Sequence, residues 1–540
     1  MPSLCTAFTK ILGSKESIKT ALVSTLVFGL LAHLYCWTNA LYSHDSLLIV
    51  QDWHVQVGFG RFSQWLYLAI RGPIVAPWLI GSLGLLFLSI GNALVVDLLG
   101  IRRRCFIVLI CGALTTSATV TLVNATYLSW FDCFMLAYAL SVLAIKTTMR
   151  FRLGFLWGTL LLCLSEGLYQ SYLTTALTLA ALFCIKLLLN SSASVPPKIA
   201  GRLGATIAGG TILYYLIAKA IQMVTGISDP NSYNSLSSAL QFNSFREVAD
   251  TLIQTWTLPL QYLLIPETYA GPVVGAVNVL LLAASLALLW KFSSSKRIPY
   301  TRLIEILILI GALPLCTNAI CFIAAGTLHG LMIFSYSLWY LLPVLIFEAY
   351  LASNKSDALE GKTSPHRKSN SGSRRERALV SSPLFQLTFI ICFILVLSNT
   401  IYANQVYTKK DLEYQSTLSA MTRLAERMDT TDGYVPGETP VVFLGSLAEN
   451  KTYGARRVFP PQNLPDEHIY ATGIKYTMSV TYPNTIRRYF EYVLGCPINL
   501  YDQADVMERI SSDEKTSNIP PFPNQHCIRW IDDILVVRLS

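Results

Sequence analysis

Long apolar stretches, separated by short charged or turn segments, recur along most of the chain. We identify eleven, at residues 20–39, 74–96, 105–123, 128–145, 153–166, 170–189, 204–225, 271–290, 303–322, 330–350 and 384–403. A bilayer core is crossed by about 20 helical residues. Only 14% of the residues are charged and 53% are hydrophobic, whereas a soluble domain has about 25% charged residues. The sequence therefore predicts an all-α polytopic membrane protein, whose short fifth stretch could pair with the sixth as a re-entrant hairpin.

Lys and Arg are unevenly distributed between the connecting segments. They concentrate in residues 1–19, in alternate connections and in a basic linker at 353–383, whereas the opposite loops before residue 404 contain only Arg61, Arg71 and Arg246. Because basic residues near span ends resist translocation, the N-terminus and the linker are predicted to be cytoplasmic. An odd number of spans then places residues 404–540 outside, with loops 40–73 and 226–270. The lipid bilayer explains the composition, so no nucleic-acid partner is expected.

Four further segments follow from this topology. Residues 20–352 are predicted to form a transmembrane catalytic module, the linker 353–383 to be disordered, 384–403 to be the last span, and 404–540 to form a small exported α/β domain. In this tail we expect helices at 411–428 and 486–494 and strands at 440–445 and 534–539. Cys496 and Cys527 could form a disulfide in an oxidising compartment, although their spacing does not decide it.

The two long outside loops each contain an amphipathic stretch, at 53–68 and 235–258. Such stretches can lie along the membrane interface, so each is a candidate lid over a membrane-embedded site.

Ionisable residues in or beside the spans gather at one depth, near the outer membrane boundary. They are Asp132, Glu166, Lys219 and His329, joined by Asp45, Asp52, His54 and Arg61 of the first outside loop. A charge at the bilayer centre costs about 2.5–3.5 kcal/mol, so this shared depth indicates a site. With no Cys-x-x-Cys pair or Cys/His cluster in the sequence, no metal site is predicted.

A site with carboxylates and fixed cations at the headgroup level suits a sugar linked to a polyprenyl phosphate. Arg61 and Lys219 could stabilise the leaving phosphate, and a carboxylate could accept the proton of an attacking hydroxyl. A proton-coupled transporter would instead need carboxylates near the midplane, on broken helices. The alternative function is a non-catalytic transporter or flippase of a lipid-linked sugar.

Each candidate residue also has a purely structural interpretation. Asp45 could be a solvated loop carboxylate, and Arg61 and Lys219 could be interfacial anchors. Asp132 and Glu166 could join helices through hydrogen bonds. The remaining candidates have such interpretations too: Glu166 and Gln170, four residues apart, are expected on one helix face, His329 could be a polar turn residue, and Trp53 could belong to an interfacial aromatic belt with Trp65, Trp78 and Trp130.

Short motifs in the chain resemble those of a known family. They are Asn39-Ala-Leu-Tyr-Ser-His-Asp45-Ser-Leu, Gly58-Phe-Gly60-Arg61-Phe-Ser, Glu166-Gly-Leu-Tyr-Gln170-Ser-Tyr172, Asn518-Ile-Pro-Pro-Phe-Pro523 and Ile534-Leu-Val-Val-Arg-Leu539. They resemble the serotype-converting O-antigen glucosyltransferases, polytopic enzymes of the GT-C class that use undecaprenyl phosphate glucose. The resemblance implies inverting transfer of a hexose to a hydroxyl of a lipid-linked or surface glycan, outside the bacterial cytoplasmic (inner) membrane and without a cofactor.

The shared depth and the resemblance together give the candidate residues their expected roles. Asp45 or Asp52 would act in catalysis, and Arg61 and Lys219 would bind the donor phosphate. Asp132, Glu166, Gln170, Tyr172, Trp53 and His329 would contact substrate. His44 takes the place of the first member of the family's acidic pair, which leaves Asp45 alone at that point. The exported tail is expected to support acceptor selection.

Overall fold

The computed structural model describes residues 15–39, 41, 47, 53–190, 194–227, 238–266, 271–294, 298–360, 383–447, 449–450 and 483–540. Ten of its helices are long and apolar enough to cross a membrane, and the shorter apolar helix α9 accounts for the fifth predicted stretch. The all-α polytopic fold predicted from the sequence is therefore confirmed.

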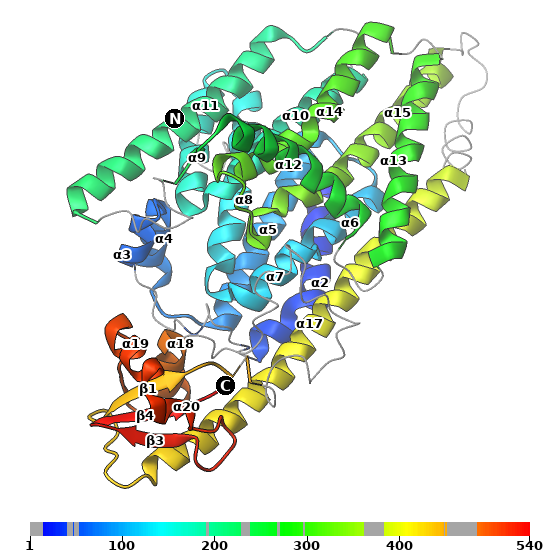
Figure 1. Ribbon diagram of the computed structural model, residues 1–540. Helices are drawn as coiled ribbons and strands as arrows, with labels where there is room; N and C mark the ends of the chain where they lie inside the picture. Colours follow the sequence, from blue (N-terminus) through cyan, green and yellow to red (C-terminus); the bar gives the residue numbers. More distant parts are fainter. Residues whose placement is uncertain are drawn as a thin grey trace.

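The membrane module is a bundle of helices (Figure 1). Its helices are α2 (Lys15–Thr38), α5 (Pro77–Leu99), α6 (Arg104–Thr115), α7 (Ala118–Thr126), α8 (Phe131–Arg150), α9 (Gly154–Leu168), α10 (Leu173–Asn190), α11 (Pro197–Thr225), α13 (Gly271–Ser294), α14 (Tyr300–Ile323) and α15 (Leu341–Glu360). Helix α8 packs against α5 and α9, and α2 packs against α5. Short 3₁₀ turns precede several of them: η1 (Leu128–Trp130), η2 (Gln170–Tyr172), η3 (Gly330–Met332) and η4 (Phe334–Tyr340). The predicted linker therefore begins in a helix, because α15 continues through Glu360.

Close packing at the centre of the bundle depends on small residues of α5. A Cβ atom added at Gly81, Gly84 or Gly91 would lie 2.3 Å from a ring atom of Trp37, Phe131 or Tyr138, respectively. Small residues allow membrane helices to approach one another in this way. These three glycines allow α5 to pack closely against α2 and α8, which carry those rings.

The two long loops that were predicted to lie outside contain helices between the apolar spans. The first loop holds α3 (Trp53–Gly58) and α4 (Phe62–Arg71), and the second holds α12 (Phe245–Leu264). Figure 1 shows α3 and α4 at the end of the bundle nearest the tail. The amphipathic stretch predicted at 53–68 is thus two short helices, because Gly60 with φ of +75° breaks it.

The helix of the last predicted span continues into the tail. Helix α17 runs without interruption from Pro383 to Asp429, so the predicted span at 384–403 and the predicted tail helix at 411–428 are one helix. No Gly or Pro stands between residues 404 and 429 to stop it. In Figure 1 this helix follows one edge of the bundle and continues into the tail.

The tail is a small α/β unit built around the outer end of α17. Its four-stranded sheet has the order β2-β1-β4-β3, from β1 (Pro440–Leu444), β2 (Asn499–Leu500), β3 (Ile528–Ile531) and β4 (Ile534–Arg538). β1 is parallel to β2 and β4, and β3 and β4 form an antiparallel pair. The helical elements are α18 (Pro483–Arg488), the π turn η7 (Tyr489–Leu494), α19 (Ala504–Ser512) and α20 (Glu514–Ser517). The expected strands at 440–445 and 534–539 and the helix at 486–494 are all present, while α19, α20, β2 and β3 were not predicted.

Candidate active site

The turn between α3 and α4 sets the position of Arg61. The Gly60 amide donates to the Val57 carbonyl at 2.9 Å, and the Arg61 amide donates to the Gln56 carbonyl at 2.8 Å. Gly60 lies in the left-handed region, which a residue with a side chain rarely adopts. The chain therefore reverses at Gly60, and Arg61 caps the start of α4.

The guanidinium of Arg61 lies close to two aromatic rings. Its Cζ is 5.3 Å from the centroid of the Phe59 ring and 5.0 Å from that of Tyr169. Its Nη1 donates to Gln56 Oε1 at 3.3 Å, and the buried Nε makes no hydrogen bond to any residue that the structure describes. Arg61 is half-buried, so it is a fixed cation that keeps unused donor capacity.

The junction of α9 and α10 holds the α3–α4 turn in place. Gln170 Nε2 donates to the Phe59 carbonyl and to the Tyr214 hydroxyl of α11, each at 2.8 Å. Gln64 Nε2 donates to the Leu168 carbonyl at 2.7 Å. A Cβ at Gly167 would lie 2.4 Å from Ser63 Oγ, so only glycine allows α4 this close.

Glu166 and Gln170 do not share a helix face, so that prediction was wrong. Helix α9 ends at Leu168, and Tyr169 is extended, with φ of −160° and ψ of 117°. Both side chains nevertheless reach α11, because Glu166 Oε1 accepts a hydrogen bond from Thr211 at 2.9 Å. This contact is the helix-joining role that the sequence left open for Glu166.

Asp132 is fully buried at the start of α8 and is paired with α4. Its Oδ2 is 3.3 Å from Arg71 Nη1 and accepts a hydrogen bond from the Tyr67 hydroxyl at 3.0 Å. Burial and the neighbouring Asp132 carboxylate raise the pKa of Tyr67 well above its usual range, so the hydroxyl stays protonated and donates. Asp132 therefore fixes the far end of α4, opposite Arg61.

Lys219 lies on α11, one turn before Gln222. Gln222 Nε2 donates to the Gly58 carbonyl of α3 at 2.8 Å. Residues three apart on a helix share a face, and Lys219 is half-buried. The structure thus places Lys219 on the part of α11 that meets α3.

The contacts described for the other substrate-contact candidates are with residues other than Arg61, and one side chain cannot be located. Tyr172 is buried, with its ring centroid 6.2 Å from that of Tyr169 and 5.9 Å from that of Phe334. His329 is half-buried before η3, its amide 3.4 Å from Met332 Sδ, and burial lowers its pKa. Trp53 opens α3, but its side chain lies outside the description, as do Asp45 and Asp52.

Neither tail cysteine is in a disulfide. Cys496 and Cys527 are free thiols. Cys496 Sγ lies 3.6 Å from the Leu494 carbonyl, whereas Cys527 Sγ lies 3.8 Å from Arg427 Nη1. The two thiols thus have different neighbours, and the disulfide considered from the sequence is not formed. Among the described residues, no group of His, Cys, Asp and Glu could hold a metal ion.

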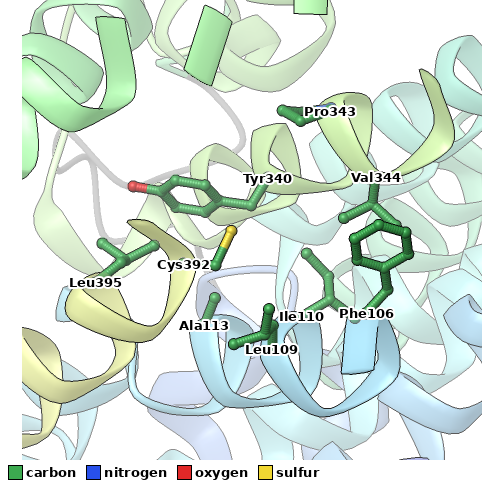
Figure 2. A pocket seen from close by; sticks show the side chains of 9 residues that line it. All are labelled: Phe106, Leu109, Ile110, Ala113, Tyr340, Pro343, Val344, Cys392 and Leu395. Atoms are coloured by element: carbon green, nitrogen blue, oxygen red, sulfur yellow. The ribbon is translucent and has the colours of Figure 1, made fainter. Parts of the chain in front are cut away.

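A separate crevice lies between α6, α17 and the segment that starts α15 (Figure 2). Its lining comprises Phe106, Leu109, Ile110, Ala113, Tyr340, Pro343, Val344, Cys392 and Leu395. None of these side chains is charged and Tyr340 is the only one with a hydroxyl, so the crevice has no cation for a phosphate and few hydrogen-bond partners for a sugar. The polar neighbourhood of Arg61 remains the better candidate.

The sequence did not reveal several residues that build this neighbourhood. Arg71 was the most accessible to prediction, since it is one of three outside-loop arginines and Asp132 was placed at the same depth. Gln56, Gln64 and Gln222 carry no signal of their own, because their partners are backbone carbonyls or side chains brought close by packing.

Comparison with known proteins identifies one family. Residues 34–347 match the family model described as Glucosyl transferase GtrII. The match includes every contact of Arg61, Asp132 and Gln170 described above and ends before α17. No curated protein and no solved structure matches the chain.

Proposed function

The chain belongs to the GtrII glucosyl transferase family, and we propose that it transfers glucose from a polyprenyl phosphate to a hydroxyl of a lipid-linked or surface polysaccharide, such as an O-antigen. The reaction would take place at the outer side of a bacterial cytoplasmic membrane, with inversion at the anomeric carbon and a GT-C-like catalytic module. Family membership supports the sugar and the type of reaction. The donor, the acceptor and the stereochemistry are our proposal.

The observation that carries this proposal is the environment of Arg61. A half-buried guanidinium held by Gln56, Phe59 and Tyr169 has donor capacity left for an incoming anion. Arginine presents a planar fork that matches phosphate oxygens. Helix α4, which Arg61 caps, has exposed apolar residues on its other face: Trp65, Leu66 and Ile70. Such a helix suits the headgroup layer, where the phosphate of a polyprenyl lipid lies.

In the proposed reaction, Arg61 and Lys219 bind the donor phosphate. The acceptor oxygen attacks the anomeric carbon from the face opposite the phosphate, and its proton passes to the carboxylate of Asp45. The bond between the anomeric carbon and the phosphate oxygen breaks, and polyprenyl phosphate leaves with that electron pair. Attack from the opposite face inverts the configuration. Asp52 is the second candidate for the base.

The remaining candidates divide into supporting and contacting residues. Asp132, Glu166 and Gln170 support the site by holding α4 and α11, as their hydrogen bonds indicate. Trp53 and His329 are proposed to contact the sugar or the acceptor. Tyr172 would act by packing behind Tyr169, whose ring covers Arg61.

The test is a transfer assay with purified protein in proteoliposomes. The donor is polyprenyl phosphate glucose that carries a radiolabel in its sugar, and the acceptor is a lipid-linked polysaccharide. Transfer should yield labelled polysaccharide and free polyprenyl phosphate. The transporter alternative predicts movement of the labelled donor across the bilayer without a labelled product. Label that crosses but never joins an acceptor would therefore reject the proposed transfer.

A further inference from the structure

Leu47, from the first outside loop, is buried in the hydrophobic core of the tail. Its side chain is 0% exposed and belongs to the tail cluster that includes Met421, Leu424, Phe443 and Tyr489. Leu41, six residues earlier, is buried instead in the core of the membrane module. The first outside loop therefore connects the two cores.

The tail that receives Leu47 is fixed to the membrane module by α17. The Tyr407 hydroxyl lies 2.7 Å from His33 Nδ1, and the Tyr35 hydroxyl donates to Asp411 at 2.6 Å. The same helix then supplies Met421 and Leu424 to the tail core. Leu47 therefore docks into a core that α17 holds at a set position.

Docking of Leu47 restrains the segment that leads to the candidate active site. α3 begins at Trp53, six residues after Leu47, so their Cα atoms can be at most about 22 Å apart. α3 in turn contacts α11 through Gln222 and carries the turn that sets Arg61. In the sequence, Asp45 lies two residues before Leu47.

We infer that Leu47 is a positioning residue, through which the exported tail holds the first outside loop in place for glucosyl transfer. The effect on glucosyl transfer rests on the proposed function, whereas the contact of Leu47 with the tail core does not. The tail then acts on the chemical step, in addition to any part in acceptor selection. Burial of one leucine side chain changes the equilibrium constant between the docked and undocked loop roughly 10- to 100-fold.

The contact is tested without any activity measurement. Leu47→Cys and Met421→Cys are introduced together on a background lacking the native cysteines, and membranes are treated with a short, reducible bismaleimide. Because both side chains lie in one cluster, an intramolecular crosslink should form. The matched control pairs Leu47→Cys with Leu418→Cys, an exposed position of α17 that is not a member of the cluster, and should crosslink less. Failure of the first pair to crosslink overturns the inference, whether or not the protein is a glucosyltransferase.

The consequence is tested by turnover. Leu47→Ala should lower kcat about tenfold or more with little change in the KM for donor, and Leu47→Met should restore most of it. Leu424→Ala, a tail-core leucine outside the loop, controls for general weakening of the tail, and limited proteolysis shows whether the tail stays folded. Wild-type kcat in a folded Leu47→Ala variant overturns the positioning role.

The crosslinked protein decides the case in which Leu47→Ala unfolds the tail. If the loop is docked on the tail in the active enzyme, the crosslinked double variant keeps its turnover. Loss of turnover on crosslinking, with recovery after reduction of the linker, would mean that the loop must leave the tail and would overturn the inference.

Discussion

At the scale of single residues, the geometry of one arginine is the feature most open to test. Arg61→Lys keeps the positive charge but removes the planar fork and its stacking on Phe59 and Tyr169. Transfer should fall at least about tenfold, because hydrogen bonds to charged groups contribute about 1.5–3 kcal/mol. Steady-state kinetics with the polyprenyl donor gives the measurement, and Lys219→Arg should be milder.

Arg246 offers a matched control for Arg61. It also lies in an outside loop, but its side chain is 91% exposed and is 3.7 Å from Asp250 one turn along α12. Arg246→Lys should leave transfer unchanged. Equal activity of Arg61→Ala and the unaltered protein would remove Arg61 from the site.

The proposed base gives a second prediction at this scale. Asp45→Asn keeps the size of the side chain but cannot accept a proton, so kcat should fall by about 10²- to 10⁴-fold while donor affinity changes little. Stopped single-turnover assays would separate the chemical step from binding. Near-normal turnover would move the assignment to Asp52, whose Asp52→Asn variant should then show the loss.

The Asp132–Arg71 pair predicts an effect on stability. Both side chains are almost wholly buried, so Asp132→Leu alone leaves an uncompensated guanidinium and should cost about 3–5 kcal/mol. The double variant Arg71→Met with Asp132→Leu should recover much of that loss. Thermal unfolding in detergent measures both, and a single variant as stable as the double would contradict the pairing.

At the scale of elements, α4 is an amphipathic helix with two different faces. Tyr67, Gln64 and Arg71 hold its inner face to the bundle, while Ile70 on the outer face is 86% exposed. We expect the outer face to lie in the lipid interface. Ile70→Glu should then displace α4 and raise the KM for the polyprenyl donor, whereas Ile70→Leu should not. An unchanged KM in the Glu variant would show that this face does not meet lipid.

Element boundaries show where sequence patterns are informative. Hydrophobic length was sufficient for ten of the eleven predicted stretches, because the bilayer demands about 20 apolar residues whatever the packing, whereas the fifth stretch is the shorter helix α9. Hydrophobic length did not predict that the span at 384–403 and the tail helix at 411–428 are one helix, since the polar part of α17 is stabilised by partners such as Tyr489 that are distant in sequence. The break at Gly60 is local and could have been predicted from the glycine pair at 58 and 60.

At the scale of the whole molecule, the orientation in the membrane remains a prediction. A cysteine placed in the tail, for example by Ser512→Cys on a background lacking native cysteines, should react with an impermeant reagent in intact cells. One placed in the basic linker by Asn370→Cys should react only after the cells are opened. The reverse pattern would place Arg61 on the cytoplasmic side and contradict the proposed location of the reaction.

The candidate site was only partly accessible from the sequence, for a reason that concerns the whole chain. The shared depth of Arg61, Asp132 and Glu166 was predicted from the topology. The structure places Arg61 at the start of α4 and connects Asp132 to α4 and Glu166 to α11. Which groups touch depends on how helices far apart in the chain pack, as in the contact between Gln170 and the Phe59 carbonyl. The hydropathy pattern predicts where a residue lies along the membrane normal. It does not predict which helices lie side by side, because that depends on the shapes of their side chains.

The burial of Leu47 among residues 420–539 has a consequence for the order in which the protein is completed. β4, a strand of the Leu47 docking site, begins at Ile534 and is therefore synthesised long after Leu47. At about 5–20 residues per second, the ribosome needs roughly 25–100 s to make the intervening chain. During that interval the first outside loop has no tail to dock into, even after the helices around Arg61 have been inserted. If the tail positions the loop as inferred above, a chain that stops before β4 would carry the membrane module without its docked loop, and glucosyl transfer should begin only after β4 has been made and folded.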